Sequence, residues 1–223
     1  MTQPAANEPL LRPLTPAADA HLVLANLGLT VDILHAALDS GEQAASSATK
    51  YHPLLTAGME RWIATVAGLR SRLVQELEWT LEDPKGSPRV VRPDGELSIM
   101  VIGGTIGTGQ LDGPTPSNKN RRGPSTGESV NSNQLALPLD ISIPITGTGP
   151  EEILTWVLLY YRAKDPNETR AELSLPSKVV KNRIVEWEYR IILPPISHNL
   201  PLPPDVDGDG DGGIDFPIVD RGR

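Results

Sequence analysis

The stretch TWVLLYYR, residues 155–162, decides the fold of this chain. It is continuously apolar and lies between two breakers, Pro150 and the pair Asp165-Pro166. A run that is apolar on both faces is typical of a strand buried at the centre of a sheet. A short helix over 151–162 is the alternative, because Glu151-Glu152 after Pro150 is a plausible first turn. We favour the strand.

Alternating apolar residues flank this run on both sides and predict further strands. The alternating segments are 97–101, 135–145, 171–175 and 185–193. Short turns join most of these five strands, which favours antiparallel pairing. Neither a β-helix-β alternation nor an internal repeat is visible. We therefore predict an antiparallel β domain over 89–196, either a sheet or a small β-sandwich, interrupted by a long polar loop at 107–134.

The segment LALPLDISIPI, Leu135–Ile145, alternates apolar and other residues without a miss. This pattern predicts a strand with one face in the core and the other in solvent. Because Pro138 and Pro144 cannot donate backbone hydrogen bonds, we place the strand at a sheet edge. Such an edge is a surface with which another chain can pair.

Residues 15–83 carry helical periodicity and predict an antiparallel helical hairpin. The first helix begins at Thr15-Pro16 and is expected to stop at Ser40-Gly41. The second is expected to run from Pro53 to Asp83-Pro84. Each helix has an apolar stripe whose members are three or four residues apart, so the two helices can pack together as a short coiled coil. The second stripe is Leu55, Met59, Trp62, Val66, Leu69 and Leu73.

A hairpin of two stripes buries little surface by itself, so its other apolar residues need cover. We expect Trp62, Ile63 and Leu77 to contact the β domain or another subunit, and we take these residues as the candidate interface. The fold class is therefore α+β: the hairpin at 15–83 is followed by the β domain, with a disordered segment at 1–14 and a flexible tail at 197–223.

Composition narrows the classes of function. The chain of 223 residues has a formal net charge of −8 and contains no cysteine. The missing cysteines exclude disulfide frameworks, thiolate catalysis and cysteine-bound metals. The N-terminus lacks the apolar core of a signal peptide, and no run reaches the roughly 18 apolar residues of a membrane span. We expect a cytoplasmic protein without membrane contact.

The tail is Pro-rich and then acidic, and it contains the run DGDGDGG over 207–213. Carboxylates that alternate around glycine suit a hard cation, and this run resembles an EF-hand or dockerin calcium loop. The resemblance implies calcium ligands at Asp207, Asp209, Asp211 and Asp215. It covers about ten residues, and Ile218 stands where the family has a bidentate glutamate. A solvating acidic tail without a bound cofactor is the alternative, which we favour.

The polar loop contains a small basic cluster, Lys119, Arg121 and Arg122. In an acidic protein such a cluster is a candidate contact for phosphate or for an acidic partner. The net charge of −8 nevertheless argues against a dedicated nucleic-acid binder, whose surface should be basic.

We conclude from the sequence that the chain is a non-enzymatic assembly or adaptor subunit that associates through the helical hairpin and the sheet edge. Its partner is either another protein or a second copy of the chain. Two alternatives stay open. One is a divalent-cation-dependent enzyme whose site combines the loop at 107–134 with the Asp-rich tail. The other is a nucleic-acid-associated component that uses the basic loop at 119–122.

Overall fold

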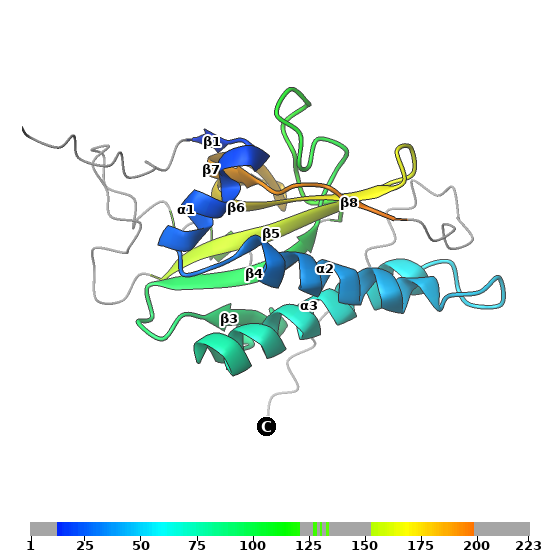
Figure 1. The fold of residues 1–223 in the computed structure, drawn as a ribbon, viewed down its shortest axis with the longest axis horizontal. Helices are drawn as coiled ribbons and strands as arrows, with labels where there is room; N and C mark the ends of the chain where they lie inside the picture. Colours follow the sequence, from blue (N-terminus) through cyan, green and yellow to red (C-terminus); the bar gives the residue numbers. More distant parts are fainter. Residues whose placement is uncertain (1–12, 121–126, 129, 131–132, 134–152, 199–223) are drawn as a thin grey trace, which may run out of the picture.

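The computed structural model describes residues 13–120, 127–128, 130, 133 and 153–198. These residues form an α+β fold, with helices packed on a mixed eight-stranded sheet (Figure 1). The predicted class is confirmed, but the prediction that all strands pair antiparallel is wrong. The strand predicted at 135–145 lies outside the described residues, as does nearly all of the tail at 197–223.

The sheet has the strand order β1-β7-β6-β5-β4-β3-β2, and β8 pairs with β6 beyond the end of β7. The strand β5 lies near the middle of the sheet, and most of its residues are buried, as the apolar run predicted. The helical alternative for this segment is therefore excluded. The strands are β1 (Leu14–Thr15), β2 (Thr80–Glu82), β3 (Arg89–Val91), β4 (Leu97–Gly103), β5 (Leu154–Ala163), β6 (Glu168–Val180), β7 (Arg183–Ile192) and β8 (Ile196–Ser197).

Two strand pairs are parallel, namely β4 with β5 and β1 with β7. Leu97 pairs with Leu154 at the start of the first pair. The chain leaves β4 at Gly103 and has about 50 residues in which to return to the same end of the sheet before β5 begins. A connection of this length permits a parallel crossover, whereas the prediction assumed short turns.

The first predicted helix is two helices, because the chain bends by 109° between them. Gly28 adopts a positive φ of 72°, and the next residue, Leu29, donates its N–H back to the Leu24 carbonyl at 2.9 Å. Thr30 then caps the following helix by accepting from the Ile33 N–H. The elements are the 3-10 turn η1 (Ala17–Asp19), α1 (Ala20–Asn26) and α2 (Val31–Ser46).

The second predicted helix, α3 (Thr56–Leu77), is shorter than expected at both ends. It ends where Glu78 adopts a left-handed conformation, and the Trp79 N–H donates to the Leu73 carbonyl. The chain then turns directly into β2, so Leu81 belongs to the sheet rather than to the helix. A 3-10 turn, η2 (Pro84–Gly86), connects β2 to β3.

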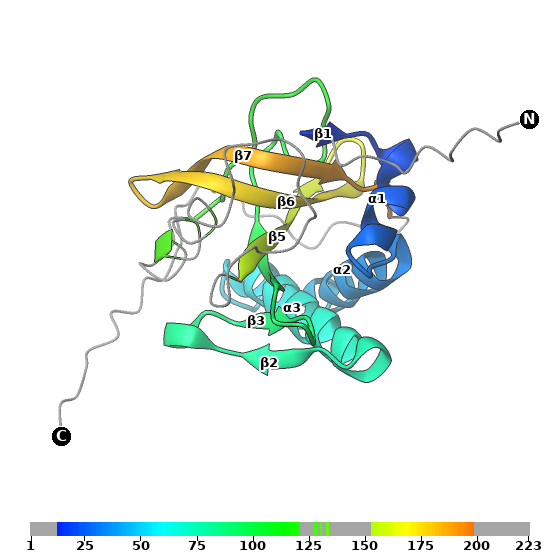
Figure 2. The ribbon, with the colours of Figure 1, turned by 90° about the vertical axis from the view of Figure 1, so that its left-hand side faces the viewer.

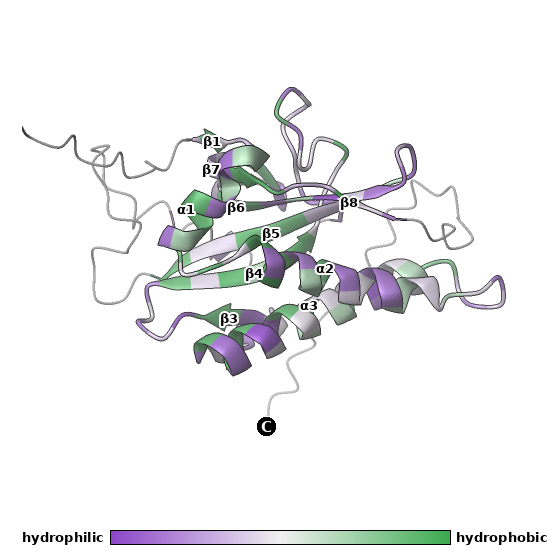
Figure 3. Ribbon diagram, in the orientation of Figure 1, coloured by the Kyte–Doolittle hydropathy of each residue, from purple (hydrophilic) through white to green (hydrophobic). Residues whose placement is uncertain are grey.

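The helices lie together on one face of the sheet (Figure 2) and bury a shared core with it. Apolar colour dominates β4 and β5 in Figure 3. The largest fully buried side chains of this core include Leu24, Leu34, Leu69, Leu73, Ile99, Trp156 and Leu158. A smaller cluster forms on the opposite face of the sheet, from Met100, Ile102, Val157, Leu159 and Ile184.

Candidate docking surface

The α2–α3 hairpin is held together by a close approach of the two helices at Gly41. A Cβ atom at this position would lie 2.0 Å from the Thr65 Oγ1 atom and 2.7 Å from the Arg61 carbonyl oxygen of α3. Only glycine fits such a gap. Gly41 was predicted to stop the helix, but α2 continues past it to Ser46. The predicted hairpin is therefore present, with a small residue at its crossing.

The apolar stripe of α3 divides into a buried half and an exposed half. Val66, Leu69 and Leu73 are buried against the sheet, whereas Leu55 and Met59 are exposed. The reason is visible in Figure 1, where the connection between α2 and α3 projects beyond the strands at one end of the molecule. Core-facing positions in the first turns of α3 therefore have no sheet beneath them.

Trp62 marks the boundary between the two halves. Its side chain is half-buried, and its indole Nε1 donates to the Val101 carbonyl of β4 at 3.1 Å. The strand β3 pairs with β4 only as far as Met100. The Trp62 indole therefore covers the edge of β4 at Val101, one residue beyond the end of this pairing. Trp62 thus contacts the β region, one of the two contacts that the sequence allowed for it.

Five large apolar side chains are exposed at the tip of the hairpin, and we call them the tip patch. Three of them stand four residues apart and form one ridge: Leu55, the N-cap residue of α3, Met59 and Ile63. Figure 3 shows apolar colour in the connection that precedes this helix. Together they expose roughly 500 Å² of apolar surface, at about 200 Å² for each fully exposed side chain. Their exposed fractions are Tyr51 85%, Leu54 70%, Leu55 41%, Met59 44% and Ile63 46%.

A buried ion-pair network fixes the base of this tip to the sheet. The Glu42 carboxylate of α2 accepts from Arg61 Nε of α3 and from Arg162 Nε of β5, each at 2.8 Å. Burial opposes ionisation of this carboxyl, but the hydrogen bonds and charges of the two arginines outweigh it, so its pKa lies below the ordinary value. The carboxylate therefore stays charged and ties both helices to β5.

The same network continues to His198, the last residue that the structure describes. Arg162 donates to the Asn167 side chain, whose amide donates to the His198 carbonyl at 2.8 Å. The His198 Nε2 atom lies 2.8 Å from Thr169 Oγ1. Burial lowers the pKa of this imidazole. The chain therefore leaves the described fold close to the base of the hairpin.

The other predicted site residues lie in separate places. Leu77 is half-buried and packs against the core, whereas Ile63 belongs to the tip patch. Lys119 is exposed, and Arg183 of β7 donates to its carbonyl and to that of Asn118. Arg121, Arg122 and the tail aspartates Asp207, Asp209, Asp211 and Asp215 lie outside the described residues. Within the part described, no group of three or more acidic or histidine side chains is arranged to hold a metal ion.

Sequence reasoning missed Tyr51 and Leu54 as members of the exposed surface. Tyr51 lies just before Pro53, where the second helix was expected to begin, and Leu54 lies just after it; neither residue was given a role. The signal was available: two exposed-loop positions on either side of Pro53 carry large apolar residues where polar ones are usual. It also assigned Leu55 and Met59 to a buried stripe.

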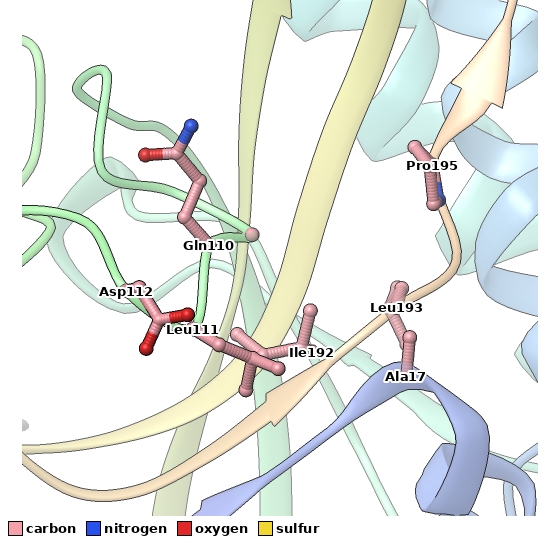
Figure 4. Close-up of a pocket in the computed structure, with 8 residues that line it drawn as sticks. Ala17, Gln110, Leu111, Asp112, Ile192, Leu193 and Pro195 are labelled. Carbon is pink, nitrogen blue, oxygen red and sulfur yellow. The ribbon is translucent and has the colours of Figure 1, made fainter.

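A shallow pocket of about 420 Å³ lies between η1, the end of β7 and the segment 109–112, and none of the tip-patch residues lines it. Figure 4 shows Gln110 and Asp112 on one rim, opposite Leu193 and Pro195. Its walls are mainly apolar, and Asp112 is the one charged group among them. The lining residues are Ala17, Gly109, Gln110, Leu111, Asp112, Ile192, Leu193 and Pro195.

The chain matches no protein-family model, no curated protein and no solved structure. Among the described residues, no single helix is long and apolar enough to cross a membrane. The segments Ala17–Asn26 and Val31–Ser46 reach the length and apolar composition of a membrane span only when they are taken together as a bent pair. Both segments contribute side chains to the core.

Proposed function

We propose that this chain is a non-enzymatic assembly or adaptor subunit that binds an amphipathic helix of a protein partner through the tip patch. The observation that carries the proposal is the exposed apolar ridge of Leu55, Met59 and Ile63 at the start of α3. A ridge of residues four apart packs into the groove of a second helix at about −50°.

The size and rigidity of the tip support this role. An interface with an apolar fraction of about 60% and roughly 500 Å² of apolar surface spans about 800 Å² on each partner, which is the standard size for a specific complex. The contact at Gly41 and the ion pairs of Glu42 hold the two helices before any partner arrives. Binding to such a preformed surface costs little ordering entropy.

Site-specific photo-crosslinking tests the proposal. A benzophenone amino acid replaces Met59 in one variant and the exposed Gln75, further along α3, in the control. We expect a discrete crosslinked product in the native host from position 59 and none from position 75. Equal products from both positions, or none from either, would contradict the proposal.

The crosslinked partner then permits a quantitative test with purified proteins. Ile63→Glu should weaken binding at least tenfold, or about 1.4 kcal/mol, because it places a charge on the apolar ridge. Gln75→Glu, which adds the same charge elsewhere on α3, should leave the affinity unchanged. If the crosslinked partner is a second copy of the chain, light scattering replaces the affinity measurement.

Contact with a polyanion is a second candidate function. Arg183 brings the loop that carries Lys119 to the turn between β6 and β7, where Lys181 is also exposed. Three cations therefore gather at one end of the molecule. Fluorescence anisotropy with a single-stranded oligonucleotide should show salt-dependent binding that Lys119→Glu weakens. Binding that does not depend on the salt concentration, or that Lys119→Glu leaves unchanged, would exclude this second function.

A further inference from the structure

We propose that the apolar C-terminal peptide Ile214–Val219 of this same chain folds back onto the tip patch and competes there with the partner. This inference rests on the proposed function, because it treats the same patch as a docking surface. It adds a regulator to that surface. Three observations support the choice of this occupant: where the chain leaves the described fold, how long the connection is, and what the peptide contains.

The exit point of the chain selects the tail among the segments outside the described residues. Asn133 bonds to Thr155, so the segment 134–152 begins beside the start of β5, at the end of the sheet away from the tip (Figure 1). The segment 1–12 joins the fold at Pro13, next to Arg190 of β7. Neither segment is anchored near the tip patch.

The tail, in contrast, leaves from His198. A chain of hydrogen-bonded side chains leads from this residue through Asn167, Arg162 and Glu42 to Arg61. Arg61 lies on α3 two residues from Met59 and from Ile63. Side chains two residues apart point to different sides of a helix, so this network reaches the level of the ridge along α3 and not its face. The tail therefore starts beside the base of the hairpin that carries the patch.

The length of the connection fits this geometry. About 15 residues separate His198 from Ile214; three of them are prolines and four are glycines. A flexible chain of this length has a root-mean-square span of about 20 Å, and the prolines extend it further. Tethering at such a length gives an effective concentration of about millimolar, so a weak contact suffices to cover the patch.

The composition of the peptide matches the patch. Ile214, Phe216, Ile218 and Val219 follow the acidic run within six residues, and Phe216 is the single phenylalanine of the chain. The tip patch offers the complementary apolar surface on the same molecule.

Methyl NMR on the full chain tests the inference, because the chain has only three methionines and the two that the structure describes lie in different places. Met59 lies in the tip patch, and Met100 is buried in the cluster on the other face of the sheet. The chain has no cysteine, so Arg221→Cys provides a single attachment point for a nitroxide. We expect the nitroxide to broaden the Met59 methyl signal and to leave the Met100 signal unchanged.

The controls separate the possible outcomes. Phe216→Ser with Ile218→Ser should abolish the broadening while the nitroxide stays in place. A mixture of nitroxide-labelled chains and isotope-labelled chains should show none, because the contact is within one molecule. Broadening that appears only in the mixture would overturn the inference in favour of a second copy. An unbroadened Met59 signal in the labelled chain would overturn it outright.

The partner experiment distinguishes this inference from the proposed function. Deletion of residues 205–223 should increase crosslinking from position 59, because the competitor is gone. Crosslinking that is unchanged by the deletion contradicts the competition and leaves the proposed function intact. Tail docking by NMR without any crosslinked partner contradicts the proposed function and leaves the docking intact.

Discussion

Replacing Gly41 by alanine tests the close approach of α2 and α3 on which the tip depends. In an open helix this change stabilises by about 1 kcal/mol, because alanine has the higher helix propensity. At Gly41, however, the new Cβ would lie 2.0 Å from Thr65 Oγ1 and 2.7 Å from the Arg61 carbonyl oxygen. The side chain of Thr65 can rotate, but the carbonyl belongs to the backbone, so the helices must separate.

The magnitude follows from these contacts. Forcing Thr65 from its position costs about 0.5–1.5 kcal/mol, and separating two packed helices costs about 1–3 kcal/mol. After the propensity gain, we expect Gly41→Ala to lower the free energy of unfolding by about 1–3 kcal/mol. Gly58→Ala is the matched control on α3, since nothing lies within 4 Å of its Cβ position. It should stabilise by up to about 1 kcal/mol.

Urea denaturation followed by circular dichroism measures both variants. Opposite signs for Gly41→Ala and Gly58→Ala support the geometry. Thr65→Ala in the Gly41→Ala background should recover part of the loss, because it removes the nearer of the two contacts. Stabilisation by Gly41→Ala equal to that of the control would refute the close approach.

Three further predictions concern the contacts that hold the fold. Glu172→Gln should cost about 3 kcal/mol or more in urea denaturation, because the fully buried carboxylate pairs with Arg190 at 2.6 Å and the arginine would lose its counter-charge. Trp62→Phe should cost about 1 kcal/mol, since the Val101 carbonyl loses its donor; an unchanged midpoint would contradict the hydrogen bond. In the folded state the pKa of Glu42 lies below its ordinary value of 4.5. The stability that its charged form contributes is therefore fully present above pH 4.5 and is lost as the pH falls through the pKa of the folded state. Glu42→Gln should remove this contribution, so the difference in melting temperature between the wild type and the variant should shrink as the pH falls below 4.5. A difference that does not change with pH would refute the reasoning.

Periodicity predicted which segments are helices and strands, but it carried no information on pairing direction. The run at 155–162 is apolar on both faces because β5 has neighbouring strands on both sides and packed layers above and below. The same burial occurs in a parallel and in an antiparallel pair. The direction of β4 against β5 depends on where the chain returns after Gly103, and that segment has no regular pattern.

The break between α1 and α2 shows how a continuous stripe conceals a bend. Val23 and Leu34 lie on different helices but enter the same core, so their spacing continues across the turn. The sequence did contain the signals of a helix end and a new helix start, namely Gly28 followed by Thr30. At Gly41 the reverse holds, because a glycine that resembles a stop permits close packing instead.

The extent of the sheet, rather than the helical pattern, decides which half of the α3 stripe is exposed. Leu55 and Leu69 occupy equivalent faces of the helix, yet only Leu69 has strands beneath it. Because the side chains of the exposed half keep 41–46% of their surface in solvent, they add less to stability than the fully buried half does. Gly41 and Glu42 hold the projecting turns by contacts that do not involve the tip patch. The proposed binding surface and the contacts that hold the hairpin therefore involve different side chains, and we expect substitutions in the patch to weaken the proposed binding without unfolding the chain.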